Sequence, residues 1–542
     1  MGLARAQEEL FRRYRLDGWW GQTTVGDLVA VLASERPDDP AVITPSARLS
    51  WSRYHEASLL LSRVVHGVGL GRGERVAVLL DDGPSPHVVY VANQRAGLVT
   101  VGIGARAGER EIATLIDKTG AKALLTHSVH RGFEAPELFE RLRRSAPSLQ
   151  HHIVVPKFED VSGTGAVGVD GEPAPDPAVE PHDPLGPDEL FMINSTSGTT
   201  GLPKCVMHNE NSKLYMAQQA VRCGELISGN EVIMGAAPIP FGFGMFTTHF
   251  LTALLGVPAV VTERFDPELT CRLIESESAT VLIAVSSQFK MLLNAGLGER
   301  FDGSSLRVMF TGGEAIPFAT AAQFEKRTGA KLLNFYGSNE SGMATGTKTT
   351  DPQELRLGTG GTYLPGTDLV LFDDEGQITT SGRGQPASRG PAVCLGYFGD
   401  PAANDELFTE DGYVLHADIC TIDQGGYLRV VGRKSDIIIR GGKNLSAAVV
   451  EEQVNGHPSV AIAAAVPVAD PVLGERVCAF VELHPGTTLT FGELIEFLET
   501  EGYSKETFPE YLSVVPQLPR SSGGKIAKGE LLREAERISR AT

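Results

Sequence analysis

The stretch Asn194–His208, NSTSGTTGLPKCVMH, gathers hydroxyl side chains and glycines and then places Pro203 and Lys204 after them. Backbone N–H groups, Ser/Thr hydroxyls and one cation can together cradle phosphate oxygens. Taken alone, such a run is also typical of an exposed surface loop. It lacks the Gly-x-x-x-x-Gly-Lys-Ser/Thr spacing of a Walker A loop. The stretch therefore predicts a polyphosphate loop of another kind.

Short apolar runs alternate with amphipathic stretches on both sides of this run. Residues 75–81 and 98–104 are typical of buried strands, and 85–97 and 109–120 of helices. The same alternation returns between 258 and 338. It predicts an α/β fold of doubly wound parallel sheets. Ligands of such sheets bind beyond the carboxyl ends of the strands, where the Gly-rich turns of this chain fall.

The character of the chain changes in two other regions. Residues 156–189 are rich in proline, glycine and acidic side chains, which predicts a solvated connector. Short apolar runs joined by Asp/Gly turns predict a small β-barrel or antiparallel sheet at about 355–430. After Arg433 we expect a short α+β segment.

The composition excludes several classes of function. Of the 542 residues, 67 are acidic and 48 basic, which gives a formal charge of −19. Nucleic acids and anionic membranes reward clustered Lys and Arg, so neither is expected as a partner. Six scattered cysteines without a Cys-x-x-Cys pair argue against a disulfide framework or zinc site. The amphipathic N-terminus is unlike a secretory leader and no apolar run could span a bilayer, so we expect a cytoplasmic protein.

Two further Gly-rich turns follow predicted strands. In Phe310–Pro317 (FTGGEAIP) two glycines would let a flat ligand approach the backbone. Asn334–Gly342 (NFYGSNESG) offers an aromatic face in Tyr336 and a carboxylate in Glu340. A carboxylate beside a phosphate loop is repulsive unless a divalent cation lies between them, as Mg²⁺ does in nucleotide sites. Each turn alone is equally typical of an ordinary strand connection.

Three charged residues in the last quarter of the chain are candidates for nucleotide contacts. Asp418 could accept hydrogen bonds from ribose hydroxyls, and Arg433 could pair with phosphate or ribose. Lys525 lies in a Gly-flanked loop, LPRSSGGKIAKGEL, just before the last predicted helix. Taken singly, each residue is as typical of a surface ion pair or a solvated charge.

In order and spacing these segments resemble the adenylate-forming superfamily of acyl-CoA synthetases, aryl-CoA ligases, luciferases and peptide-synthetase adenylation domains. STSGTTGLPK is similar to its phosphate loop, and YGSNES to its Tyr-Gly-x-x-Glu motif. GYLRVVGRKSD is similar to the junction before its mobile C-terminal domain, and PRSSGGKI to its catalytic-lysine loop. The resemblance covers most of the chain. It implies an AMP-binding domain over 1–434 and a mobile C-terminal domain over 435–542, with the hinge at Ser435.

The resemblance also implies a reaction. The family joins a carboxylic acid to ATP, giving an acyl-adenylate and pyrophosphate, and a thiol then displaces AMP. Lys525 would be catalytic, because it meets the carboxylate and the α-phosphate when the C-terminal domain closes. The other implied roles are Ser197, Gly198, Thr199, Thr200, Gly201 and Lys204 for phosphates, Gly313, Glu314 and Tyr336 for adenine, Asp418 and Arg433 for ribose, Thr196 and Glu340 for Mg²⁺, and Gly441, Gly442, Lys443 and Asn444 for coenzyme A.

The segment Pro238–Met245 (PIPFGFGM) corresponds to the family's gate beside the acyl pocket. Phe241 lies at the gate position and Phe243 follows, so both are expected to line the acid site. Two phenylalanines are equally typical of core packing. Because Gly242 and Gly244 leave space around them, we expect a cyclic, aromatic or medium-chain carboxylic acid.

Some positions depart from the usual family pattern, and several readings stay open. None of the departures removes an expected phosphate or metal ligand. We expect free coenzyme A as the acceptor, because no carrier segment follows the Lys525 loop. Loading of a separate carrier-protein thiol, a luciferase-like oxidation, a nucleotide-binding homologue without turnover, and a homodimer stay open. The departures are Cys205, Asn209-Glu210, His416-Ala417, Ser435, Ala447 and Val449.

Overall fold

The computed structural model describes most of the chain, and the structural statements below concern the residues that it describes. These form two compact units, the first drawn from 1–196, 202–369 and 387–415 and the second from 370–386 and 416–542. The described residues are 2–158, 167–174, 183–196, 204–313, 316–373, 375–433, 437–440, 443–471, 473–520 and 526–541.

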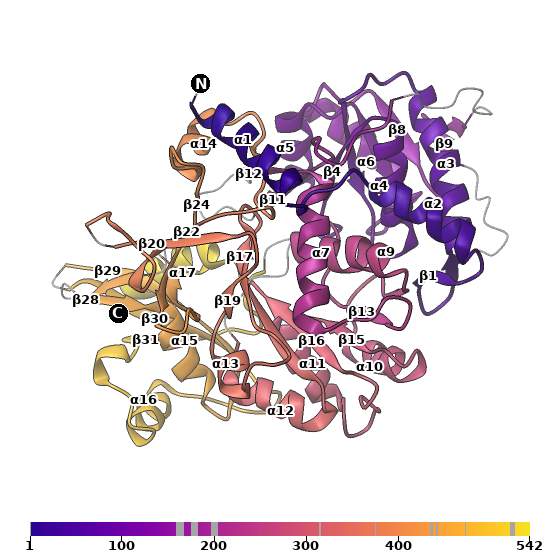
Figure 1. Ribbon diagram of the computed structural model, residues 1–542. Helices are drawn as coiled ribbons and strands as arrows, with labels where there is room; N and C mark the ends of the chain where they lie inside the picture. Colours follow the sequence, from indigo (N-terminus) through magenta and orange to yellow (C-terminus); the bar gives the residue numbers. More distant parts are fainter. Residues whose placement is uncertain are drawn as a thin grey trace. The chain divides into compact units, whose positions relative to one another are not determined.

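Two nine-stranded sheets form the framework of the first unit (Figure 1). One runs in the order β19 (Thr362–Tyr363), β18 (Gly342–Gly346), β17 (Lys331–Ser338), β16 (Val308–Gly312), β15 (Val281–Ile283), β13 (Ile233–Gly235), β14 (Ala259–Val261), β1 (Pro40–Ile43), β2 (Arg48–Ser50). The other runs β10 (Glu172–Pro173), β9 (Gly168–Val169), β8 (His151–Val154), β5 (Ala123–Thr126), β3 (Arg75–Leu79), β4 (Val99–Ile103), β11 (Met192–Thr196), β12 (Lys204–His208), β23 (Gly396–Tyr397).

Helices connect these strands and cover the sheets. The helices of the first unit are α1 (Gly2–Leu16), α2 (Val25–Glu35), α3 (Trp51–Gly67), α4 (Pro84–Arg95), α5 (Glu109–Thr119), α6 (Ala135–Ser145), α7 (Glu210–Gly224), α8 (Gly242–Met245), the π-helix η1 (Phe246–Leu251), α9 (Thr252–Leu255), α10 (Pro267–Ser276), α11 (Ser286–Ala295), α12 (Phe318–Thr328), α13 (Gln353–Gly358) and α14 (Pro401–Leu407). A small hairpin pairs β6 (Val129–His130) with β7 (Phe133–Glu134).

The predicted α/β class is confirmed. Residues 75–79 of the run 75–81 form β3, which pairs in parallel with β4 on one side and β5 on the other. In the sheet that runs from β19 to β2, the strands β13, β14, β15, β16 and β17 also pair in parallel. Helices such as α4 and α12 follow these strands directly. Strands covered on both faces are apolar throughout, which explains the near-continuous Val, Leu and Ile runs of the sequence.

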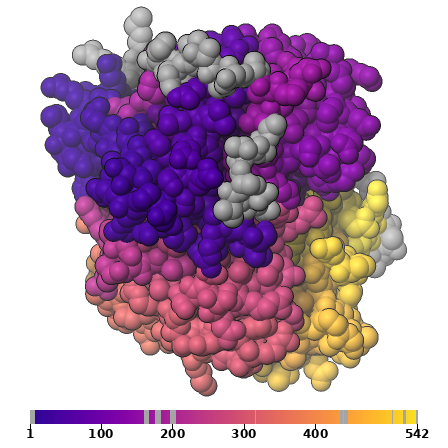
Figure 2. Space-filling view, turned by 90° about the vertical axis from the view of Figure 1, so that its right-hand side faces the viewer, coloured from indigo at the N-terminus to yellow at the C-terminus, as the bar shows by residue number. Residues whose placement is uncertain are grey.

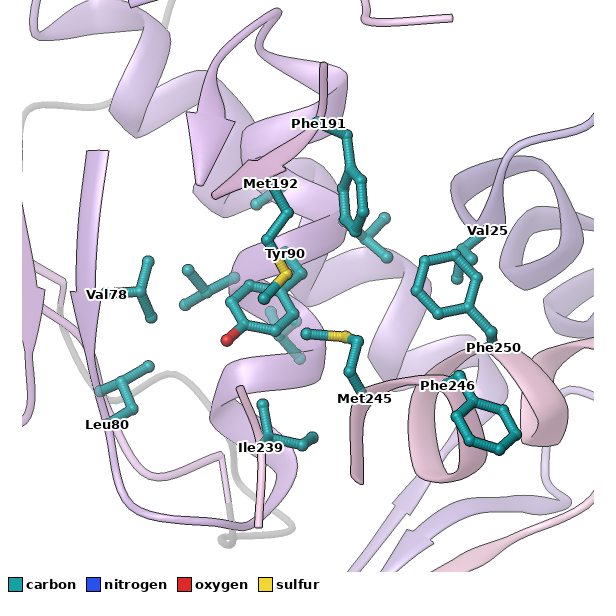
Figure 3. Close-up of a cluster of buried hydrophobic side chains, with 14 of the residues drawn as sticks. Val25, Val78, Leu80, Tyr90, Phe191, Met192, Ile239, Met245, Phe246 and Phe250 are labelled. Carbon is teal, nitrogen blue, oxygen red and sulfur yellow. The ribbon is translucent and has the colours of Figure 1, made fainter. Parts of the chain in front are cut away.

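The largest core cluster takes side chains from both nine-stranded sheets and from the helices that cover them. Figure 3 shows Tyr90 of α4, Met192 of β11 and Met245 of α8 pointing toward one another. All three side chains are at most 2 % exposed. Each fully buried apolar side chain of this size stabilises the fold by roughly 1.5–3 kcal/mol. This packing anchors the segment after Pro240, which carries the expected gate.

Strands from the N-terminal part of the chain complete the sheet that runs from β19 to β2. Strand β1 pairs in parallel with β14, more than two hundred residues later. In the space-filling view the indigo N-terminal surface accordingly continues into the pink surface of later segments (Figure 2). Within the described residues, no helix combines the length and apolar character needed to cross a membrane.

Part of the expected connector is ordered as strand. Residues 168–169 and 172–173 form the hairpin β9–β10, and β9 pairs with β8 at the sheet edge. The hairpin turns at Asp170 and Gly171, both with positive φ. A two-residue Asp-Gly turn of this kind is a strong hairpin signal. It was hidden in the sequence by the surrounding proline and acidic residues, which lie partly outside the described residues.

Antiparallel pairing dominates from residue 368 onward. Strands β20 (Asp368–Phe372), β21 (Ile378–Thr379), β22 (Gly382–Arg389), β25 (Asp418–Ile422) and β26 (Leu428–Arg433) form a sheet with β24 (Val414–Leu415) beside β22. A second sheet combines β27 (Ile437–Arg440), β28 (Lys443–Ser446), β29 (Val460–Asp470), β30 (Gly474–Leu483) and β31 (Tyr511–Val514). The associated helices are α15 (Ala447–Asn455), α16 (Phe491–Thr500), the 3₁₀ turn η2 (Lys505–Thr507) and α17 (Lys528–Ala541).

A buried acid in the first unit should make stability depend on pH. Glu210 is 2 % exposed and accepts a hydrogen bond from the Val25 backbone N–H at 2.8 Å. Burial raises the pKa of Glu210 to about 8. Between its ordinary value of 4.5 and about 8 the folded state therefore holds a proton that the unfolded state has lost, so stability falls as pH rises through this window.

Glu210→Gln keeps the acceptor oxygen and removes the titration. We expect the variant to melt at a higher temperature than the wild type, by an amount that grows from pH 5 to pH 8. Over this range the difference in the free energy of unfolding should grow by about a few kcal/mol. Circular dichroism melts at four pH values in this range measure it. A melting-temperature difference that stays constant across these pH values contradicts the prediction.

Candidate active site

The carboxyl ends of β16 and β17 bring two predicted adenine-binding residues together. The two strands pair in parallel, with Gly312 opposite Phe335. Gly313 directly follows the end of β16, and Tyr336 is the next residue along β17. Gly313 has φ +81°, a conformation that favours glycine. A Cβ on Gly312 would lie 2.5 Å from the Phe335 carbonyl oxygen. Close approach of the backbones is therefore built into this edge of the sheet, where ligands of parallel sheets bind.

The turn after β17 is held by two glycines and carries Glu340. A Cβ on Gly337 would lie 1.8 Å from the Gly342 carbonyl oxygen, an impossible contact. Gly342 has φ +62°, and its Cβ would lie 2.4 Å from the Ala392 carbonyl oxygen. Neither position can carry a side chain without moving backbone. The glycines of the motif thus fix the direction in which the turn leaves the sheet.

Tyr397 of β23 joins two predicted site residues. Its hydroxyl donates to Glu340 Oε1 at 2.8 Å, and the ammonium nitrogen of Lys204 lies 4.7 Å from the centre of its ring. The Cys394 backbone N–H donates to the Glu340 carbonyl oxygen at 2.8 Å. The residue at the end of the phosphate-loop run and the expected metal ligand therefore meet at one aromatic side chain.

Tyr397 stays a neutral phenol. Burial, and then the Glu340 carboxylate, raise the pKa of its hydroxyl well above the ordinary value. The hydroxyl is therefore the donor and the carboxylate the acceptor at neutral pH. Glu340 makes no ion pair with a described Lys or Arg residue, so its second oxygen is not taken up by a neighbouring cation.

On the other side of the turn, an amide pair made of the buried Asn194 and the half-buried Asn339 connects three segments. Asn339 Nδ2 donates to Asn194 Oδ1 at 2.6 Å, and Asn194 Nδ2 donates to Asn339 Oδ1 and to the Pro240 carbonyl oxygen, each at 3.2 Å. His208 Nε2 lies 3.0 Å from Asn194 Oδ1. Asn194 thereby ties the end of β11 to the Glu340 turn and to the gate segment.

Lys213 adds a positive charge inside this part of the molecule. It lies on α7 and is only 1 % exposed. Burial lowers its pKa to about 8, against the attraction of Cys394 and Glu340, and the ammonium form still prevails at neutral pH. The cost of burying this charge is offset in part by the Glu340 carboxylate. The pKa of the adjacent His208 is well below its ordinary value because of burial and this neighbouring charge.

The gate segment runs from the cis Ile239–Pro240 bond into α8. Phe241 and Phe243 are both half-buried. The Phe243 ring meets Phe246 edge to face at 5.5 Å, and it packs against the main core cluster. A Cβ on Gly242 would lie 3.3 Å from Asn339 Oδ1. The gate is therefore adjacent to the turn that carries Glu340.

The second unit holds the two predicted ribose-binding residues on paired strands. Asp418 begins β25 and lies opposite Arg433, which ends β26. Lys443 begins β28, opposite Arg440 on β27. For Arg433, Lys443 and Asn444 the backbone alone is described, as it is for Thr196 in the first unit. Antiparallel pairing places Asp418 and Arg433 side by side, as a shared ligand would require.

Several predicted site residues lie outside the described residues. The strands that lead into and out of the phosphate-loop run are described, with Thr196 paired to Lys204. Gly313, on the neighbouring adenine segment, is described as well. The predicted residues that lie outside are Ser197, Gly198, Thr199, Thr200, Gly201, Glu314, Ser435, Gly441, Gly442 and Lys525.

Four functional candidates in this region were missed from the sequence: Tyr397, Asn194, His208 and Lys213. The short segment GYFGDP contains Tyr397, but an aromatic residue after glycine is also typical of an ordinary core. Asn194 opens the phosphate-loop run, and only its partners across the sheet show its role. His208 and Lys213 are polar residues in apolar surroundings, which becomes apparent once burial is known.

The donor set around Glu340 fits Mg²⁺. Within the described part of the chain, no three His, Cys, Asp or Glu side chains lie close enough to hold a metal ion by themselves. Mg²⁺ in nucleotide sites uses one or two carboxylates together with substrate phosphates and water. One half-buried carboxylate, fixed by a neutral donor and not paired with a described Lys or Arg, matches that pattern.

Comparison with known proteins identifies the family of the chain. The AMP-binding enzyme profile matches residues 30–398, and the profile of the AMP-binding enzyme C-terminal domain matches 449–525. The chain is similar to the medium-chain fatty-acid–CoA ligase of Escherichia coli (strain K12), with 31 % identity over 523 residues that cover 95 % of this chain and 91 % of that one.

Two further similarities concern an aryl acid ligase and a solved structure. The salicyl-AMP ligase / salicyl-S-ArCP synthetase of Mycobacterium tuberculosis is 29 % identical over 534 residues, covering 96 % of this chain and 92 % of that one. The fold matches that of ATP-bound MatB from Rhodopseudomonas palustris with a TM-score of 0.82, at 24 % identity and 95 % and 99 % coverage. The chain therefore belongs to the AMP-binding enzyme family, the ATP-using adenylate-forming ligases of acyl and aryl acids.

Proposed function

We propose that the protein is an acyl-CoA ligase that adenylates a carboxylic acid with ATP and then transfers the acyl group to coenzyme A. The observation that carries this proposal is the junction at Tyr397, where a cation from the phosphate-loop run and a half-buried carboxylate meet. A nucleoside triphosphate that binds with a divalent cation needs a positive side chain for its phosphates and a carboxylate for the metal at one place. Membership of the AMP-binding family supports the same reaction.

In the first half-reaction a carboxylate oxygen of the acid attacks the α-phosphorus of ATP. The bond between this phosphorus and the bridging oxygen to the β-phosphate breaks, and pyrophosphate leaves with the electron pair. Lys204 and residues 197–201 would hold the β- and γ-phosphates, and Glu340 with Thr196 would hold Mg²⁺. When bound, Mg²⁺ neutralises charge on the phosphate oxygens. The acid is already ionised at neutral pH, so this step needs no catalytic base.

The residues proposed for adenosine divide into an adenine set and a ribose set. Gly313, Glu314 and Tyr336 would frame the adenine, and Asp418 with Arg433 would bind the ribose. Lys525 would reach the α-phosphate and the acid carboxylate. Because charge grows at that phosphate during in-line displacement, a cation fixed there stabilises the transition state more than the ground state.

In the second half-reaction the thiol sulfur of coenzyme A attacks the acyl carbon. The bond from that carbon to the AMP oxygen breaks, AMP leaves, and the thiol proton passes to solvent. We propose that the domain over 435–542 pivots at Ser435 between the half-reactions. The pivot would move Lys525 away and bring Gly441, Gly442 and Lys443 to the pantetheine arm. A hinge of this kind needs only a few residues that absorb a large backbone change.

The acid is proposed to be a cyclic, aromatic or medium-chain carboxylic acid. Phe241 and Phe243 are half-buried beside glycines, so one wall of the acid site would be apolar and aromatic. The two similar ligases named above act, by their names, on a medium-chain fatty acid and on salicylate. An acid with an apolar body and a polar group would fit both the apolar wall and the polar edge that Asn339 forms next to it.

The second candidate is an enzyme that loads a carrier-protein thiol. It is favoured by the salicyl-S-ArCP synthetase, whose name denotes such a product. The pantetheine arm is common to coenzyme A and carrier proteins, so Gly441, Gly442 and Lys443 would serve either acceptor. Coenzyme A is preferred here because the similar Escherichia coli enzyme is, by its name, a CoA ligase.

A substrate panel tests the proposal directly. Linear, aromatic and polycyclic acids are each incubated with ATP and Mg²⁺, and pyrophosphate release and hydroxamate trapping report adenylation. We expect at least one class to give acid-dependent pyrophosphate release, and free coenzyme A to convert that adenylate to a thioester. Thioester formation only with a carrier protein supports the second candidate. No acid-dependent pyrophosphate release across the panel contradicts both.

A further inference from the structure

We propose that Tyr397 is a positioning residue that holds Glu340 and Lys204 apart and in fixed orientation, ready for a metal-bound triphosphate. This inference rests on the proposed function, because it takes Glu340 as the metal ligand and Lys204 as a phosphate ligand. It concerns a residue on β23, far from both in sequence. The hydroxyl contacts the anion and the ring face contacts the cation, so Tyr397 gives each of them a defined place.

The hydroxyl fixes the carboxylate. It donates to Glu340 Oε1 at 2.8 Å and uses one lone pair of one oxygen. Hydrogen bonds to charged groups are stronger than those between neutral groups, so this one can select one side-chain rotamer of Glu340. The Glu340 carbonyl oxygen is tied to the same segment through the Cys394 N–H at 2.8 Å. The main chain and the side chain of Glu340 are therefore both hydrogen-bonded to one short stretch, residues 394–397.

The ring face places the cation. The Lys204 ammonium lies 4.7 Å from the ring centre, within the range of a cation–π contact. Lysine has a long flexible stem, and restricting it in advance reduces the entropy lost when phosphate binds. Lys204 and Glu340 form no ion pair with each other. A direct salt bridge would neutralise the charges that ATP and its cation need, so the intervening ring keeps both available.

Tyr397 is itself rigidly held. It is 6 % exposed and lies opposite Val206 in the β12–β23 pair. Its backbone N–H donates to Asn404 Oδ1 at 2.6 Å, and Asn404 Nδ2 donates back to its carbonyl oxygen at 2.9 Å. The next residue, Phe398, donates from its N–H to the Cys205 carbonyl oxygen at 2.8 Å. A side chain with both backbone groups bonded and its ring buried is suited to position others.

Three single variants separate these roles. Tyr397→Phe removes the hydroxyl and keeps the ring, so the anchor of Glu340 is lost and the Lys204 contact stays. Tyr397→Leu removes both and allows a Lys204–Glu340 ion pair to form. Tyr215→Phe is the matched control, since Tyr215 is fully buried and donates its hydroxyl to the Pro365 carbonyl oxygen at 2.5 Å, away from both charges.

Binding is measured without turnover, using calorimetry with the non-cleavable analogue α,β-methylene-ATP at several Mg²⁺ concentrations. For Tyr397→Phe we expect the Mg²⁺ concentration giving half-maximal tightening to rise about tenfold, and analogue affinity without Mg²⁺ to change less than about twofold. For Tyr397→Leu we expect about tenfold weaker binding in both conditions. Tyr215→Phe should leave both quantities unchanged. Melting temperatures measured alongside show whether any variant has lost its fold.

Comparison with Glu340→Gln distinguishes failure of this inference from failure of the proposed function. If the wild type binds the analogue in a Mg²⁺-dependent way and Glu340→Gln shifts that dependence while Tyr397→Phe does not, the inference is wrong and the proposed function stands. If the wild type does not bind the analogue, or Glu340→Gln has no effect, the proposed site itself is wrong. If a folded Tyr397→Leu matches Tyr397→Phe in every measurement, the ring has no role in placing Lys204.

Discussion

Lys525→Ala should slow acid-dependent pyrophosphate release by about 100-fold or more, because removing one preorganised group that stabilises transition-state charge typically has this effect. Thioester formation from a supplied acyl-adenylate should change by less than about threefold. The proposed pivot at Ser435 moves Lys525 away from the reaction centre before the thiol attacks. The two half-reactions therefore differ in their need for this ammonium.

Lys528→Ala is the matched control for the loss of a lysine in the same region. Lys528 begins α17, three residues after Lys525, and its ammonium pairs with Glu451 Oε1 at 2.8 Å. Its loss should leave both half-reactions within about twofold of the wild type, because a partly exposed ion pair contributes about 0–1 kcal/mol. Single-turnover assays of each half-reaction provide the measurement. Equal slowing of both half-reactions by Lys525→Ala contradicts the two-conformation mechanism.

The alternation of strands and helices was readable from the sequence because it is a local property. Residues 76–80 (VAVLL) and 308–310 (VMF) are continuously apolar, and this composition is typical of strands covered on both faces. The pairing order was not readable in the same way. Strand β1 pairs with β14, and β31 pairs in parallel with β30, through contacts that no local pattern encodes. Sequence identified the elements, and tertiary packing decided their neighbours.

The residues of the candidate site show the same division between those recognisable from local sequence and those recognisable only from tertiary contacts. Lys204, Gly313, Tyr336 and Glu340 were identified because each sits in a motif whose composition already suggests phosphate, nucleotide or metal. Tyr397 was missed because its part depends on two residues nearly 60 and 200 positions away. The missed residues Tyr397, Asn194 and Lys213 contact or carry charge near the turn of Glu340, which the motif had already indicated.

The amide pair shows why such support cannot be predicted from one sequence. Asn194 and Asn339 are separated by 145 residues and satisfy each other's carboxamides. Either asparagine alone would be a common turn or cap residue. Once paired, their hydrogen bonds hold the gate and the Glu340 turn together, and loss of Asn339 would leave the buried Asn194 short of a partner. The physical constraint belongs to the pair.

Removal of the Glu340 carboxylate should have the other large effect. For Glu340→Ala we expect acid-dependent ATP use to fall about 100-fold at a Mg²⁺ concentration that saturates the wild type, and the Mg²⁺ requirement to shift upward. Two losses add in this variant. The cation loses its protein oxygen ligand, and the Tyr397 hydroxyl loses its acceptor in a buried position, where an unsatisfied donor costs about 1–3 kcal/mol.

Glu277→Gln serves as the control, because Glu277 is another partly buried carboxylate of the first unit and pairs with Arg48 at 2.8 Å, away from the proposed nucleotide site. It should leave the Mg²⁺ dependence unchanged. Mg²⁺ titrations of pyrophosphate release at fixed ATP compare the two variants with the wild type. Glu340→Gln should lie between wild type and Glu340→Ala, since its amide oxygen can still accept from Tyr397 but carries no charge. An unshifted Mg²⁺ dependence in folded Glu340→Ala would place the metal elsewhere, and the meeting of Lys204 and Glu340 at Tyr397 would then have to be explained as packing alone.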